Sequence, residues 1–174
     1  MLKLPKFTFL CGPRNSGQIA LARAISDQDE EINFLDFEEP IRNATQELLF
    51  DGFNSSRDMV SEAARAKPIS QDSTLDQFYD SLELQLRNNS VSLGGIAYAS
   101  WYGNGMEAIF DRFLYRDCRN PDDMLFFINR YADECLAIHL NSMAKWNIGC
   151  KQIWLPTTDT AECMANLTRE LGTN

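Results

Sequence analysis

The first part of the chain alternates between short apolar runs and amphipathic stretches. Phe7 to Cys11 is a continuous apolar and aromatic run closed by Gly-Pro, which predicts a buried strand. After Gly17, apolar residues recur at the helical period and predict a helix that ends near Ser26, and Ile32 to Phe37 predicts a second strand. Pro40 stands at the start of a further predicted helix. This order of elements predicts the opening of a parallel α/β fold.

The middle of the chain has a different pattern. Residues 55–67 and 74–88 both have apolar positions at the helical period and predict two helices. We therefore expect a helical insertion at roughly 55–120, within a single domain that spans residues 1–174. The segment from Gly94 to Gly105 is rich in glycine and aromatic residues, and the pattern leaves it open between strand and loop.

The C-terminal part returns to an alternation of helix and strand. One long helix is predicted over 122–146, a strand over 151–155, and a closing helix over 159–171 with Gly172 as its stop. Together with the opening elements, this predicts a three-layer α/β architecture, in which a parallel sheet is flanked by helices.

Composition and charge limit the classes of function. The chain has 174 residues, 44% of them hydrophobic, and a net charge of −9. This charge argues against a broad nucleic-acid surface, because phosphate backbones need clustered Lys and Arg, but it permits a small nucleotide in one pocket. No stretch approaches a membrane span, and the N-terminal apolar run is too short for a signal peptide, so we expect a cytoplasmic protein.

Cysteine and histidine content argues against a metal centre. The five cysteines form no CxxC pair, and His139 is the only histidine. We therefore expect no zinc site and no disulfide framework, but five reduced thiols in or near the core. His139 lies on the predicted long helix with no Ser or Cys constellation, so we expect a packed or surface histidine rather than a catalytic one.

The stretch FLCGPRNSGQIALARAI has the spacing of a phosphate-binding loop. Gly12 and Gly17 are separated by four residues, a predicted strand precedes them, and a predicted helix follows. Backbone N–H groups in such a loop, together with the helix dipole, bind anions. We therefore predict that nucleotide or phosphate binding involves Gly12, Arg14, Asn15, Ser16, Gly17 and Gln18.

Two side chains that supply chemistry in such loops are missing. Gln18 stands where a Lys bridges the phosphates, and Ile19 stands where the hydroxyl of a Ser or Thr holds Mg²⁺. Gln18 is neutral, and Ile19 has no oxygen atom. Arg14 is either a replacement cation or a solvated loop residue, and Arg23 is a weaker candidate for the same role.

With these features, the chain resembles the phage-type deoxynucleoside monophosphate kinases, which have the P-loop NTPase fold. Gly12, Ser16 and Gly17 match that family's G-x-x-x-S-G-K-D-T loop, and Pro40-Ile41-Arg42 matches its F-A-D-P-[IL]-K segment. The C-terminal KQIWLPTTDTAECMANLTRELG has the family's outline of a strand followed by a helix that ends in L-G. The resemblance implies a P-loop NTPase-like sheet, a substrate-binding role for Arg42, and ATP with Mg²⁺ in an active member.

The departures from the family fall on functional positions. The Lys and Thr of the loop are replaced at Gln18 and Ile19, and the family's D-x-R is replaced by Thr157, Thr158 and Asp159. Loss at three independent places that touch phosphate or Mg²⁺ favours an inactive relative. We therefore expect a kinase-like protein of phage origin, in the host cytoplasm, that binds a protein partner or assembles with itself. Weak nucleotide or phosphate binding is left open.

The alternative hypothesis is an active deoxynucleoside monophosphate or related nucleoside kinase. In that case Arg14 replaces the missing Lys and contributes to catalysis, and Asp36 or Glu38 holds Mg²⁺ with bound ATP. The acidic cluster that includes these residues and Glu39 closes the second predicted strand, where carboxylates bind metal ions or sugar hydroxyls. It also fits an acidic helix N-terminus that complements the helix dipole.

Two further groups of residues have both a binding and a structural interpretation. Arg112, Arg116 and Arg119 are spaced to share one helix face, where they would grip a phosphate or form a solvated face paired with neighbouring aspartates. Trp101 and Tyr102 would form a base-stacking lid, an anchor for a partner, or part of the core.

Overall fold

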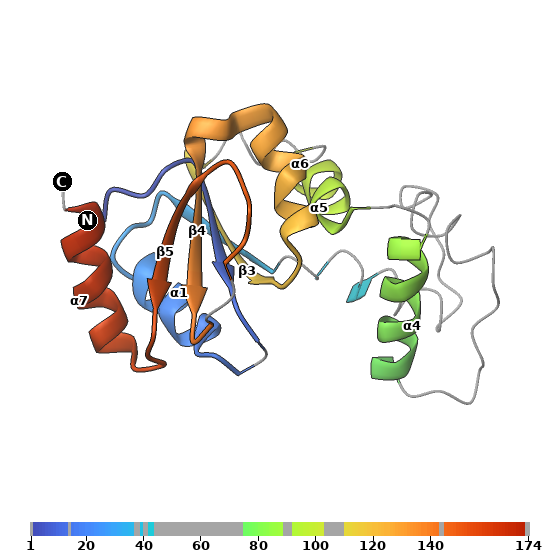
Figure 1. Ribbon diagram of the computed structural model, residues 1–174, viewed down its shortest axis with the longest axis horizontal. Coiled ribbons are helices and arrows are strands. Elements are labelled where there is room, and N and C mark those ends of the chain that lie inside the picture. The colour runs from blue at the N-terminus through green and yellow to red at the C-terminus, as the bar shows by residue number, and fades with distance from the viewer. Residues whose placement is uncertain are drawn as a thin grey trace.

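The structure is a computed structural model that describes residues 2–13, 15–36, 39, 42–43, 75–88, 92–102, 110–142 and 145–172. Within these residues, the centre of the molecule is a five-stranded sheet with strand order β2-β3-β1-β4-β5, and every neighbouring pair is parallel (Figure 1). The strands in chain order are β1 Phe7–Cys11, β2 Ile32–Asp36, β3 Arg112–Cys118, β4 Cys135–Leu140 and β5 Lys151–Leu155.

Helices cover both faces of the sheet, so the fold is an α/β fold with three layers. On one face lie α1 Gln18–Ser26 and α7 Thr160–Leu171, and on the other lie α5 Leu93–Tyr102 and α6 Pro121–Tyr131 (Figure 1). The helix α4 Leu75–Asn88 adds the buried Leu86 to the second face, and a 3₁₀ turn over Ala132–Glu134 joins α6 to β4.

Two apolar clusters, one on each face, hold the layers together. Phe7 and Phe9 of β1 point to the face covered by α5 and α6, and Leu10 points to the face covered by α1 and α7. Because both faces are covered, all five residues of β1 are buried, which explains its unbroken apolar run. The rings of Phe7 and Phe9 lie 5.4 Å and 5.1 Å from the ring of Phe127 on α6, measured between centroids.

Several elements form as the pattern predicted. Six elements lie within a few residues of their predicted bounds. They are the strands β1, β2 and β5 and the helices α1, α4 and α7. The side chain of Asp159 accepts a hydrogen bond from the backbone N–H of Glu162 and caps α7 at its N-terminus, and Gly172 ends this helix with a φ of 74°. The helices predicted after Pro40 and over 55–67 lie outside the described residues, apart from Arg42 and Asn43.

The prediction of one long helix over 122–146 is wrong. The chain forms α6, the 3₁₀ turn and then β4, which pairs with β1 and β5 near the centre of the sheet. All six residues of β4, CLAIHL, are buried. A strand that is buried on both faces has no alternation of apolar and polar residues. The apolar residues of β4 therefore look like a continuation of the preceding amphipathic helix, and the sequence shows no boundary between the two.

The extent predicted for the helical insertion also needs correction. The range 55–120 includes β3, which pairs with both β1 and β2 inside the sheet, so the chain rejoins the sheet at Arg112. The unassigned segment that begins at Gly94 forms most of α5, up to Tyr102. Gly94 lies against α6, where an added Cβ would meet the carbonyl oxygen of Asp123 at 2.0 Å. This close approach explains a glycine in the first turn of a helix.

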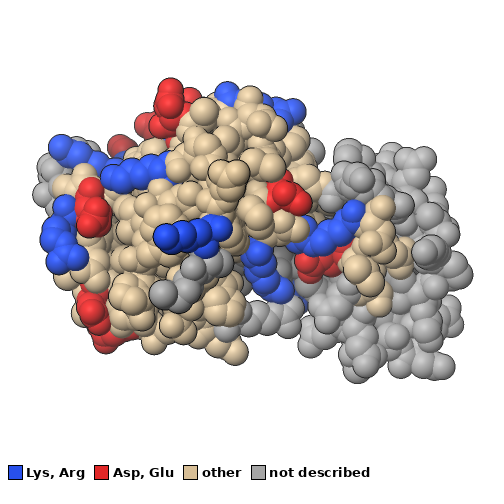
Figure 2. Space-filling model, in the orientation of Figure 1, with Lys and Arg blue, Asp and Glu red and all other residues tan. Residues whose placement is uncertain are grey.

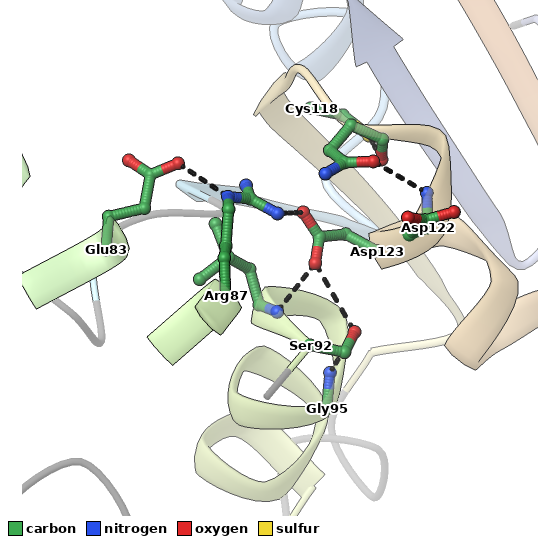
Figure 3. A network of polar contacts seen from close by, with 9 residues as sticks. Glu83, Arg87, Ser92, Gly95, Cys118, Asp122 and Asp123 are labelled. Carbon is green, nitrogen blue, oxygen red and sulfur yellow. Dashed lines mark hydrogen bonds and ion pairs between the residues drawn. The ribbon is translucent and has the colours of Figure 1, made fainter. Parts of the chain in front are cut away.

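A polar network joins α4 and α5 to the start of α6 (Figure 3). Asp123 is buried with 2% of its surface exposed, and it accepts a hydrogen bond of 2.7 Å from the backbone N–H of Leu93. Its other carboxylate oxygen forms an ion pair of 3.0 Å with Nη1 of Arg87, whose Nε donates to Glu83. Asp123 therefore satisfies an N–H group at the first turn of α5 and anchors α4 with the same carboxylate.

His139 is a packed residue of β4, and its predicted location on a helix is wrong. Its ring is fully buried, stacks on Trp154 at 5.1 Å and meets Trp146 edge-on at 4.8 Å. Its Nε2 donates to Oε1 of Gln152 at 3.0 Å. Burial lowers the pKa of His139 below its ordinary value of 6.5, so the folded state holds the neutral ring.

This burial predicts a dependence of stability on pH. Below pH 6.5 the unfolded chain takes up a proton at His139 that the folded chain does not, so stability falls as the pH drops through this region, by at most about 1.4 kcal/mol per pH unit. The variant His139→Phe keeps an aromatic ring against Trp154 and lacks this term. Urea unfolding of both proteins between pH 7.5 and 5.5 tests it, since a stability difference that does not change with pH contradicts the assignment.

Within the described residues, no helix combines the length and apolar character that crossing a bilayer requires.

Candidate functional site

The loop between β1 and α1 is shaped by two close backbone approaches. An added Cβ at Gly12 would lie 2.6 Å from the carbonyl oxygen of Leu140, at the end of β4. Gly17 caps α1 with a φ of 86°, in the left-handed region that glycine adopts without strain, and lies against the backbone of Thr158. The strand, loop and helix predicted around the two glycines are therefore present. Arg14 lies outside the described residues.

Gln18 bonds within this loop. Its Nε2 donates to the carbonyl oxygen of Gly12 at 3.0 Å and to Oγ of Ser16 at 3.4 Å. Gln18 and Ser16 are both buried, with 4% and 2% of their surfaces exposed. The neutral amide at this position therefore ties the two ends of the loop together, which is a structural role that the sequence alone did not suggest.

A cavity of about 700 Å³ opens at the carboxyl end of the sheet, beside this loop. Parallel strands bring the ends of β1, β2 and β3 to the same edge, so residues far apart in the sequence meet there. The described residues that line the cavity are Asn15, Gly17, Gln18, Ile19, Ala20, Arg23, Asp36, Arg42, Arg116 and Arg119. Its volume lies in the range of small-molecule sites in proteins.

Arginine is the most frequent residue in this lining. Arg23 comes from α1, Arg42 from the chain after β2, and Arg116 and Arg119 from the end of β3 and the residue that follows it. Asp36 is the single carboxylate among the described lining residues, and it forms an ion pair with Arg116, its register partner on the neighbouring strand. The described lining thus contains four arginines and one aspartate, in a chain whose net charge is −9.

The prediction that Arg112, Arg116 and Arg119 share one helix face is wrong, because Arg112 and Arg116 lie on β3 and Arg119 directly follows it. Arg112 begins the strand at the opposite edge of the sheet, where it forms ion pairs with Asp29 at 2.7 Å and Glu31 at 2.9 Å. Only Arg116 and Arg119 reach the cavity. The signal for β3 was the aromatic run before Arg116, followed by Asn120-Pro121, which begins α6 with the Asn120 side chain as its cap.

The other predicted site residues separate into three groups. Asn15, Gly17, Gln18, Asp36 and Arg42 line the cavity. Gly12 and Ser16 belong to the loop but are not part of the lining. Arg14 and Glu38 lie outside the described residues, while Glu39 is described and does not line the cavity. The structure thus joins three of the six predicted loop residues to an arginine cluster whose position the sequence did not predict.

The charge of the cavity differs from that of the surrounding surface. On the face drawn in Figure 2, Lys and Arg side chains of the described residues lie among Asp and Glu side chains and form no single basic field. Guanidinium groups present several N–H donors in a plane and match the oxygen atoms of phosphate. The concentration of arginine around one cavity is therefore suited to a small anion rather than to a long polyanion.

Burial makes the thiols of Cys118, Cys135 and Cys150 poor nucleophiles. Burial raises the pKa of Cys135 to about 12 and that of Cys150 to about 11, and it raises the pKa of Cys118 well above the usual range. None of the five cysteines forms a disulfide, and the described residues contain no group of three or more His, Cys, Asp or Glu side chains placed to hold a metal ion. The chemistry of the described site is therefore that of arginine and backbone N–H groups.

No family model matches this chain, and no curated protein is significantly similar to it. The fold and the site define an α/β protein in which helices flank a parallel sheet. An arginine-lined cavity lies at the carboxyl edge of that sheet.

Proposed function

We propose that this protein binds a phosphorylated small molecule, of the size of a nucleoside monophosphate, in the arginine-lined cavity and does not transfer its phosphate. The observation that carries the proposal is the meeting of Arg23, Arg42, Arg116 and Arg119 around one cavity next to the glycine loop. A phosphate monoester carries a charge of about −1.5 to −2 at neutral pH and accepts hydrogen bonds from several guanidinium groups at once.

The shape of the site supports a small ligand with an uncharged part. The cavity holds about 700 Å³, which is enough for a nucleotide. Ile19 and Ala20 place apolar surface beside the arginines, and Ile19 is 45% exposed. A ligand with one charged end and one planar or apolar end would use both parts of the lining.

The resemblance to phage-type deoxynucleoside monophosphate kinases supports the same class of ligand. In that comparison Arg42 corresponds to a substrate-binding position, and Arg42 lines the cavity. We therefore propose a degenerate P-loop kinase of phage origin that acts in the host cytoplasm.

Loss of phosphoryl transfer follows from the loop. Gln18 cannot supply the charge of the missing Lys, and its amide is engaged with Gly12 and Ser16. Removing one donor that stabilises charge in a transition state costs roughly 10²–10³ in rate. The hydroxyl expected to hold Mg²⁺ is absent at Ile19.

The experiment is a thermal-shift and calorimetric screen of the full chain with the four deoxynucleoside monophosphates and the matching nucleosides. At a concentration 100 times the dissociation constant, a bound monophosphate is expected to stabilise the protein by about 2.7 kcal/mol, which raises Tm by roughly 5–10 °C. The nucleosides are expected to have no such effect. Equal effects of nucleosides and monophosphates, or no effect of either, contradict the proposal, and ATP-dependent conversion of a monophosphate would show the active kinase instead.

A protein partner or a second copy of the chain is a second proposed function. Leu84 on α4 is 60% exposed and Trp154 on β5 is 42% exposed, so each offers one apolar side chain to a partner. Sedimentation velocity over a range of concentrations tests the second-copy version, and a monomer at every concentration contradicts it.

A further inference from the structure

The resemblance to nucleotide kinases implies Mg²⁺ as a partner of the bound nucleotide, so the donors of the cavity can be compared with what Mg²⁺ requires. Mg²⁺ binds oxygen ligands at about 2.0–2.1 Å and is held by carboxylates or hydroxyls together with substrate phosphates. The side chain that would supply a hydroxyl at the start of α1 is Ile19, which lines the cavity with carbon atoms only.

Among the described residues, the nearby hydroxyl of Ser16 and the carboxylate of Asp36 are already engaged, and Asn15 adds one neutral amide to the lining. The hydroxyl of Ser16 accepts a hydrogen bond from Gln18, is buried, and does not line the cavity. Asp36, the carboxylate among the described lining residues, forms an ion pair with Arg116. A metal ion that used Asp36 would have to break this pair and leave the guanidinium group of Arg116 beside a divalent cation.

The charge of the lining opposes a cation more generally. Arg23, Arg42 and Arg119 bring three further positive charges to the described lining, and a positive charge repels a cation. The same groups attract a phosphate and bind its oxygen atoms through paired N–H donors, which is the role that the metal ion has in an active kinase. The described lining residues therefore do not fit Mg²⁺, but they fit the anion that Mg²⁺ would otherwise neutralise.

We infer that the site binds a phosphate monoester directly on guanidinium groups, without a divalent metal ion. This inference rests on the proposed function and narrows it, because it selects a ligand with one phosphate over a metal-chelated triphosphate. The arginines neutralise the phosphate in place of a metal ion. Gln18 stands at the position of the loop Lys, but it bonds to Gly12 within the loop instead of binding the phosphate.

Calorimetric titration of the wild-type protein tests the inference, with a deoxynucleoside monophosphate and the corresponding triphosphate as probes, each in EDTA and in excess Mg²⁺. The dissociation constant of the monophosphate is expected to agree within about twofold in the two buffers, and Mg²⁺ is expected not to strengthen binding of the triphosphate. An increase in affinity of tenfold or more on adding Mg²⁺ overturns the inference but leaves the proposed binding function intact. Failure of every phosphorylated probe to bind in either buffer overturns both.

The variant Gln18→Lys/Ile19→Thr provides the matched comparison. It adds the amine and the hydroxyl that the loop lacks, and its binding is read by the same calorimetry rather than by turnover. Mg²⁺ is expected to raise the affinity of this variant for the triphosphate by about tenfold or more while leaving the wild type unchanged. A response to Mg²⁺ in the wild type as large as that of the variant contradicts the inference.

Discussion

Replacing Arg42 and Arg119 together by glutamine is expected to weaken binding of a deoxynucleoside monophosphate by about 100-fold or more. Both side chains line the cavity, from the chain after β2 and from the residue after β3. A hydrogen bond to a charged group contributes about 1.5–3 kcal/mol, so each replacement is expected to cost roughly tenfold or more in affinity. Glutamine keeps a polar side chain of similar length, and calorimetry of the folded variant measures the loss.

The control for this variant is Arg169→Gln on α7. Arg169 lies at an exposed position, where its Nη2 donates to Asn166 within the same helix, and it is not part of the cavity lining. Its replacement lowers the positive charge of the protein by one unit without changing the site, so the dissociation constant is expected to stay within about twofold of the wild-type value. If the control loses as much affinity as the double variant, the effect comes from overall charge, and the arginine cavity is not the binding site.

Replacing Asp123 by alanine is expected to lower the free energy of unfolding by about 2–4 kcal/mol. The substitution leaves the backbone N–H of Leu93 and the guanidinium group of Arg87 without their buried acceptor (Figure 3). Burial raises the pKa of Asp123, so the charged carboxylate carries a cost of desolvation that offsets part of what its contacts contribute. Arg87 keeps its contact with Glu83, which limits the loss further.

Asp122→Ala is the matched control, one residue earlier in the same helix. Asp122 is exposed and lies in the first turn of α6, where its charge complements the helix dipole, so its loss is expected to cost less than about 1 kcal/mol. Urea denaturation of the two variants measures both values. Equal destabilisation by the two substitutions would contradict the anchoring role of Asp123, because Asp123, unlike Asp122, bonds to residues of α4 and α5.

Local signals predicted the loop after β1 and the closing helix well. Gly12 and Gly17 marked a loop between a strand and a helix, and Asp159 and Gly172 marked the two ends of α7. In each case a backbone requirement, such as a cap or a left-handed φ, restricts the residue type at one position. Signals of this kind can be read from a single sequence because they do not depend on the rest of the fold.

The central strands β3 and β4 were missed for a different reason. β4 is buried on both faces, so its apolar run carries no period that separates it from α6. In β3, arginines at positions 112 and 116 are four residues apart, which also fits one face of a helix. Pairing with β1 and β2 makes this segment a strand, and the paired residues are 80 to 107 positions away in the sequence.

The composition of the site could be predicted only in part for the same reason. The loop residues are contiguous, so Asn15, Gly17 and Gln18 were found from one motif. The arginines come from α1, from the chain after β2 and from the end of β3, and they meet only because parallel strands bring their carboxyl ends to one edge. The loop lacks the positive charge of a Lys, but the arginines at this edge bring positive charge to the cavity from other elements.

A crystal structure of the protein grown with a deoxynucleoside monophosphate in the presence of EDTA tests the central claim most directly. We expect the phosphate within hydrogen-bond distance of the guanidinium groups of Arg42 and Arg119, with Gln18 still bonded to Gly12. A phosphate bound elsewhere, or a cavity that holds no ligand at a concentration that saturates binding in solution, would contradict it.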